Sequence, residues 1–307
     1  MKQKAKIAVI GIGGVGGYVA AMLGKTYPNT TLVARGERKK AIMENGLILH
    51  SECQGKDISV DTTQVVEKVS ELPEQDYIFI CVKHFSLAEV CQDLRSVVTD
   101  NTIIMPIMNG VDPGDRVREL IGKGTVLDAL AYIISYADQD YSIVQKGDYA
   151  KFRIGTMSAK ERELLAVNEV LELMKGAQID CRAMDDIQSA IWEKYILNCA
   201  FNVLTAYYSS DVKGLRQDEK RIDDYKAILK EGICVAAAKG VHLPEGLYEK
   251  LVNHFMHVQS DEGTSSLRRD MDAGKDNEKE AFGGYLVREA RRLGIAVPVS
   301  EWYYSRM

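Results

Sequence analysis

Long apolar runs and an excess of basic residues are both missing from this 307-residue sequence. No stretch approaches the ~18 consecutive apolar residues that a membrane-spanning helix requires. Lysine and arginine number 39 against 44 aspartate and glutamate, so the formal net charge is −5. This balance provides no basic field for a nucleic-acid backbone or an anionic membrane surface. We therefore expect a cytoplasmic protein with neither nucleic acid nor membrane as a partner.

Paired cysteines and clustered histidines are equally scarce. The six cysteines are Cys53, Cys81, Cys91, Cys181, Cys199 and Cys234, and none forms a C-x-x-C pair. Several lie in apolar runs, which indicates reduced, mostly buried thiols rather than a disulfide framework or a zinc site. His254 and His257 are three apart, but the sequence offers them no evident third ligand. No metal is expected.

The first part of the chain alternates short apolar runs with helical stretches. The runs expected to form strands are Ile7–Ile10 and residues 31–34, 77–82, 102–108 and 124–130. Residues 15–23 carry small and apolar side chains at helical spacing, after a glycine turn. The alternation predicts an α/β fold with a Rossmann-type, doubly wound parallel sheet covered by helices on both faces.

From about Lys160 the pattern changes to helical periodicity. The helices expected are Ile187–Tyr207 and residues 161–175, 217–239, 246–257 and 278–293. We place a nucleotide-binding domain at residues 1–180 and an all-helical catalytic and substrate domain at residues 181–307.

A glycine-rich turn at residues 11–16 matches the pattern G-x-G-x-x-G. It follows the first expected strand and opens the first expected helix, which is the context that dinucleotide binding requires. The first glycine permits the turn, the second lets backbone approach a pyrophosphate, and the third lets the helix pack on the strand. The cofactor-binding residues expected here are Gly11, Ile12, Gly13, Gly14, Val15 and Gly16. The alternative is a glycine-rich loop that binds nothing.

The second expected strand is followed by Arg35, where an NAD-binding protein usually has an acidic residue for the ribose diol. An arginine suits a 2′-phosphate instead, so NADPH is the favoured cofactor. Arg38, Lys39 and Lys40 agree with this interpretation, although they also fit a solvated basic turn.

The helix expected at Ile187–Tyr207 places Lys194, Asn198 and Asn202 on one face, four residues apart. Its other side chains are largely apolar, which indicates a buried helix. A lysine and two amides in such a place need partners. From spacing alone, neighbouring backbone groups could equally supply them.

The pattern W-x-K-x-x-x-N-x-x-x-N at residues 192–202, with the glycine turn, resembles the ketopantoate reductase (2-dehydropantoate 2-reductase) family. Further matches lie at residues 82–83, 109–110, 264–270, 274, 277–278 and 294–298, so the resemblance covers nearly the whole chain. It implies an NADPH-dependent oxidoreductase of pantothenate biosynthesis, on the coenzyme A pathway. It also implies a C-terminal domain like that of 6-phosphogluconate dehydrogenase.

Site roles follow from the resemblance, residue by residue. It implies that Lys194 donates a proton to the substrate carbonyl oxygen as hydride arrives, and that Glu278 pairs with this lysine and contacts the cofactor. The substrate-binding residues implied are Asn109, Asn198, Asn202 and Ser266. The cofactor-binding residues implied, in addition to the glycine turn and Arg35 already given, are Lys83, Asn109 and Glu278. A positioned ammonium suits this chemistry, because hydride addition to a ketone develops negative charge on oxygen.

The chain departs from the family pattern near the expected substrate contacts. Residues 84–86 stand where the family has a glutamine. Residues 210–214 offer no clear match for a polar substrate contact of the family, and Gly283-Gly284 stands where the family often has asparagine before glycine. These departures leave open a different small 2-oxo acid as substrate. A non-catalytic NADP-binding regulator is a further alternative, and a homodimer is a further expectation.

Overall fold

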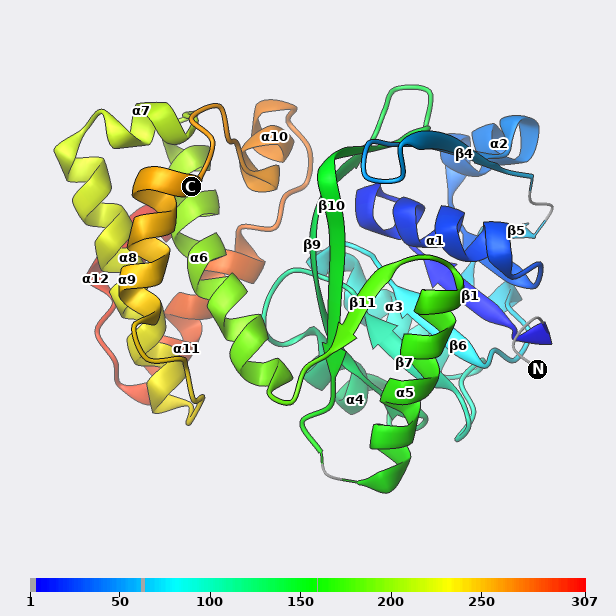
Figure 1. Cartoon of the computed structure of the whole chain (residues 1–307). Coiled ribbons are helices and arrows are strands. Elements are labelled where there is room, and N and C mark those ends of the chain that lie inside the picture. The colour runs from blue at the N-terminus through cyan, green and yellow to red at the C-terminus, as the bar shows by residue number, and fades with distance from the viewer. Residues whose placement is uncertain (1–3, 62–63, 159) are drawn as a thin grey trace. The chain divides into compact units, whose positions relative to one another are not determined.

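The computed structural model describes residues 4–61, 64–158 and 160–307. The chain divides into two compact units, Met1–Ile187 and Gln188–Met307 (Figure 1). The sequence pattern predicts this boundary between residues 180 and 181. Strand β11 (Asp180–Ala183) pairs with β10 (Ile143–Gly155), and this pairing carries the first unit past residue 180.

The first unit contains a six-stranded sheet in which every pair of neighbouring strands is parallel. Its order is β5 (Val65–Val66), β2 (Thr30–Val33), β1 (Ile7–Ile10), β6 (Tyr77–Ile80), β7 (Ile103–Pro106) and β8 (Thr125–Val126). Counted along the chain, these strands follow the order 3-2-1-4-5-6 of dinucleotide-binding folds. The Rossmann-type sheet expected from the sequence is confirmed.

Helices cover both faces of this sheet, and alternate residues of each strand enter opposite cores. Ile7 and Val9 of β1 pack with α1 (Gly14–Thr26), whereas Ala8 and Ile10 pack with α3 (Leu87–Leu94) and α4 (Pro113–Ile121). This explains the continuous apolar character of the strands, since both faces are buried.

A second sheet, which the sequence analysis did not predict, packs on the other side of α1. It has the order β11, β10, β3 (Leu47–Ser51) and β4 (Lys56–Val60), and β9 (Asp128–Ala137) pairs with β10. Apolar residues of this sheet share one core with α1 and β1. The single strand expected at residues 124–130 is wrong, because its two halves belong to β8 of one sheet and β9 of the other.

The remaining helices of the first unit are α2 (Gly36–Asn45) and α5 (Glu161–Gly176), with one-turn helices η2 (Val69–Glu71) and η3 (His84–Ser86). The second unit is helical throughout its described residues, as expected. It comprises α6 (Ile187–Tyr207), α7 (Val212–Arg216), α8 (Glu219–Ala238), α9 (Leu247–Asn253), η4 (His254–Val258), α10 (Ser266–Asp272), η5 (Glu280–Gly284), α11 (Tyr285–Leu293) and α12 (Pro298–Tyr304). None of the described helices is both long and apolar enough to cross a membrane.

Candidate active site

The glycine turn at residues 11–16 joins β1 to α1, as the motif requires. Gly11 has φ of +90°, a conformation that side-chain-bearing residues rarely adopt. A Cβ on Gly16 would lie 2.0 Å from the carbonyl oxygen of Gly11, so only glycine lets α1 approach β1 this closely. The two positions are therefore glycine for steric reasons.

The start of α1 fits a pyrophosphate group. Gly13 is the N-cap residue and supplies no side-chain cap, and the first turn contains no acidic residue. A Cβ on Gly13 would meet no atom within 4 Å, so the backbone is open on that side. Free amide groups at a helix N-terminus attract anions, and these residues have the form of a dinucleotide phosphate cradle.

Cations follow β2, but most of them contact carboxylates. Arg35 is the N-cap residue of α2, and its Nη2 lies 2.9 Å from Oε1 of Glu89. Lys39 and Lys40 lie 3.8 and 4.0 Å from the carboxylates of Glu67 and Glu37.

Arg38 is used differently from its neighbours. Its guanidinium donates a hydrogen bond to the carbonyl of Ile12 and lies over the ring of Tyr141, 5.5 Å from the centroid. Burial lowers the pKa of Arg38, and Tyr141 opposes this shift. Arg38 thus stabilises the glycine turn. Its packing on Tyr141 could not be predicted from the sequence, because Tyr141 lies about a hundred residues away.

Lys83 and Asn109 lie at the same edge of the sheet as the glycine turn. Each comes three residues after the end of a strand, Lys83 after β6 and Asn109 after β7. The strands are parallel to β1, so all three segments leave the carboxyl edge, where ligands of such folds bind. His84, one of the departures, contacts the guanidinium of Arg116 on α4 at 2.9 Å.

In the second unit, α6 carries the predicted row of polar residues. Lys194 and Asn198 are partly exposed, and Asn202 is buried. Glu278, just before η5, is also buried, with 4% of its surface exposed. Desolvation lowers the pKa of Lys194 to about 8, and the carboxylate of Glu278 opposes that shift. The lysine therefore titrates close to neutral pH.

The segment that carries Glu278 is tied to α6 by the residue next to the lysine. The hydroxyl of Tyr195 donates to the carbonyl of Phe282 at 2.7 Å, within η5. The amide of Ala281 donates to the carbonyl of Glu278 at 2.9 Å. Gly274, two residues beyond α10, has φ of +61°, a left-handed conformation common just after a helix. Such π-helical turns as η5 are frequent at functional sites.

Ser266 lies against the far end of the same row. Its Oγ is 3.5 Å from Oδ1 of Asn202. The buried hydroxyl of Thr205 donates to Oγ of Ser265 at 2.7 Å, and that oxygen accepts from the amide of Arg268 as the N-cap of α10. These bonds hold the start of α10 on α6. A serine three residues before Arg268 was the only sequence signal of this cap.

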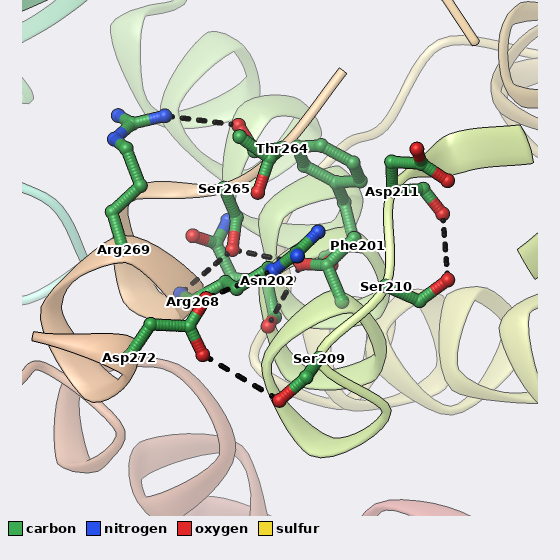
Figure 2. A network of polar contacts seen from close by, with 11 residues as sticks. Phe201, Asn202, Ser209, Ser210, Asp211, Thr264, Ser265, Arg268, Arg269 and Asp272 are labelled. Atoms are coloured by element: carbon green, nitrogen blue, oxygen red, sulfur yellow. Dashed lines mark hydrogen bonds and ion pairs between the residues drawn. The ribbon is translucent and has the colours of Figure 1, made fainter. Parts of the chain in front are cut away.

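Residues 210–214, where the sequence departs from the family pattern, form the start of α7. Oδ1 of Asp211 accepts from the amide of Gly214 at 2.8 Å as the N-cap of α7, and the hydroxyl of Ser210 donates to the carbonyl of Asp211 (Figure 2). Within the described ranges, no group of three or more His, Cys, Asp or Glu is placed to hold a metal ion.

A parallel sheet of this order with its glycine turn, joined to a helical unit with a lysine–carboxylate pair, defines the class of two-domain dinucleotide oxidoreductases. Residues 7–159 match the family model described as ketopantoate reductase PanE/ApbA, and residues 186–306 match the model of its C-terminal part. The chain belongs to the ketopantoate reductase family and is an oxidoreductase.

Relatives agree with this assignment over nearly the whole chain. It is 26% identical to YkpB of Bacillus subtilis, an uncharacterized oxidoreductase, across 98% of this chain and 97% of that protein. It is 28% identical to 2-dehydropantoate 2-reductase of Methylococcus capsulatus, whose crystal structure covers 98% of this chain and 95% of its own with a TM-score of 0.85. D-mandelate dehydrogenase with NADH and anilino(oxo)acetate shares the fold, with a TM-score of 0.86, 18% identity and coverage of 97% and 96%.

Proposed function

We propose that this protein reduces a small 2-oxo acid with NADPH, with 2-dehydropantoate as the leading substrate and pantoate as product. The observation that carries the proposal is Lys194, whose pKa near 8 lets the ammonium persist at neutral pH and still release a proton. The family and the 28% identical 2-dehydropantoate 2-reductase support the choice of substrate.

The chemistry requires stabilisation of charge at one oxygen. When bound, NADPH would supply the hydride that reduces C2 of the substrate. Lys194 stabilises the negative charge that develops on the carbonyl oxygen and then donates its proton to that oxygen. Glu278 favours the charged lysine, since its carboxylate raises the lysine pKa. We infer that Glu278 also contacts the cofactor.

The remaining assignments are orienting roles. Asn198, Asn202 and Ser266 would bind the polar groups of the substrate, an inference supported by the 3.5 Å contact between the last two. Lys83 and Asn109 would line the cofactor, and Asn109 would also face the substrate. The glycine turn would bind the pyrophosphate, and Arg35 the 2′-phosphate.

Two other functions remain in competition. One alternative is reduction of a different 2-oxo acid. The observation in its favour is the departure from the family pattern at residues 210–214, where Asp211 caps a helix. A non-catalytic NADP-binding regulator is disfavoured by the arrangement of Lys194 and Glu278. A homodimer and a cytoplasmic location stay predictions, and light scattering on the purified protein would test the first.

The proposal is tested by following NADPH oxidation with 2-dehydropantoate, pyruvate and 2-oxoisovalerate in turn. We expect turnover with the first to exceed turnover with the other two at least tenfold in kcat/KM. Preference for another acid would change the substrate but keep the reaction. Tight NADPH binding with no turnover on any of them would support the regulator.

Ser265→Ala should raise KM for the 2-oxo acid about 5- to 10-fold and leave the Kd for NADPH within twofold. The substitution removes the cap of α10 and one acceptor of the Thr205 hydroxyl, which also contacts the carbonyl of Phe201. We expect this to destabilise the start of α10 by about 1 kcal/mol and so to disturb the position of Ser266. Steady-state kinetics and calorimetric titration measure the two constants.

Ser305→Ala is the matched control, because that exposed hydroxyl contacts the carbonyl of Trp302 and the guanidinium of the neighbouring Arg306, both away from α10. Ser265→Thr should restore KM, since threonine also caps helices. An equal rise of KM in the control, or a parallel loss of NADPH binding, would refute the positioning role of Ser265.

A further inference from the structure

The start of α2, which follows β2, carries several cations, and most of them contact carboxylates. Within six residues the chain has Arg35, Arg38, Lys39 and Lys40, a set that would favour a doubly charged phosphate. Three of these four contact carboxylates, at distances of 2.9, 3.8 and 4.0 Å. The fourth, Arg38, is turned toward the glycine turn.

The Arg35–Glu89 contact is the shortest of the three, and it lies where the 2′-position of the ribose is expected. Arg35 lies two residues after the buried end of β2 and is the N-cap residue of α2, and Glu89 lies in the first turn of α3. The side chains are 54% and 60% exposed, so water solvates the pair and the contact is easily exchanged.

We propose that Glu89 sets the cofactor preference of this site, because its carboxylate competes with the 2′-phosphate of NADPH for Arg35. The inference rests on the proposed binding of a nicotinamide dinucleotide at residues 11–16. It goes further by naming the residue that weakens discrimination between the phosphorylated and unphosphorylated cofactors.

The two cofactors should respond to Glu89 unequally. A 2′-phosphate must displace the carboxylate from Arg35 and then remain beside it, so that like charges repel. The ribose diol of NADH is uncharged and does not require Arg35 to change partner. Removing the negative charge at position 89 should therefore improve NADPH binding and leave NADH binding nearly unchanged.

The test is calorimetric titration of the full-length protein with NADPH and with NADH, without substrate. We expect Glu89→Gln to lower the Kd for NADPH about three- to tenfold and to change the Kd for NADH less than twofold. Arg35→Ala should weaken NADPH binding, and in that background Glu89→Gln should no longer tighten it, because the competition has been removed.

Glu37→Gln is the matched control, since it removes one negative charge two residues from Arg35 but breaks only the contact with Lys40. It should leave the ratio of the two Kd values within twofold of wild type. A Glu89→Gln variant that matches this control, or that changes the ratio through weaker NADH binding, would overturn the role of Glu89. Failure of wild type to bind either dinucleotide would instead overturn the proposed function together with this inference.

Discussion

Replacement of Lys194 by alanine is expected to lower kcat for 2-oxo acid reduction about 10²- to 10⁴-fold, the range that a positioned general acid contributes. The substitution removes the only group to which we assign both charge stabilisation and proton donation. NADPH binding should persist, because the glycine turn lies on the first unit and the lysine on α6 of the second. Stopped assays at high enzyme concentration would measure the residual rate.

Lys226→Ala provides the comparison, since Lys226 is a lysine of α8 in the same unit whose contact is with Asp223 at 3.9 Å. Its kcat should stay within twofold of wild type. If Lys194→Ala keeps more than a tenth of wild-type kcat, the proton must come from another group and the proposed mechanism is wrong.

The same lysine predicts a pH dependence. The mechanism we propose requires the charged form of Lys194, so kcat should fall as the pH rises through about 8. Glu278 raises the pKa of Lys194. Glu278→Gln should therefore lower that pKa and move the fall in kcat to lower pH, whereas Glu249→Gln, on the exposed side of α9, should not move it. An unshifted pH profile in Glu278→Gln would show that Glu278 does not raise the pKa of Lys194.

Gly16→Ala is expected to destabilise the first unit by about 3 kcal/mol or more and to abolish dinucleotide binding. The added Cβ would lie 2.0 Å from the carbonyl oxygen of Gly11 and 2.8 Å from Cβ of Cys81. Backbone would have to move, since the nearest atom is not the end of a flexible side chain. Urea denaturation and calorimetric titration measure the two effects.

Gly13→Ala is the informative counterpart. Gly13 has φ of −90°, and a Cβ there meets no atom within 4 Å. Its unfolding midpoint should stay near wild type, while NADPH binding weakens because the methyl group occupies the space in front of the phosphates. Equal stability of the Gly16 and Gly13 variants would contradict the close approach of α1 to β1.

Much of the fold could be predicted because its signals are local. The strand Ile7–Ile10 and the helix Ile187–Tyr207 have the bounds that the sequence predicted, since runs buried on both faces and a 3.6-residue period depend on neighbouring residues alone. The same period placed Lys194, Asn198 and Asn202 in one row. The glycine turn was recognisable because strand, turn and helix are contiguous.

The second sheet and the contacts of the site were decided only by tertiary structure. β10 pairs with β3, β9 and β11, and β3 precedes it by about a hundred residues, so no local period records the pairing. The bonds of Thr205 to Ser265 and of Arg35 to Glu89 likewise join segments 60 and 54 residues apart. The sequence by itself determined which elements form and which residues share a helix face. Their partners depend on which distant segments come together when the apolar faces are buried, and packing of the whole unit settles that choice.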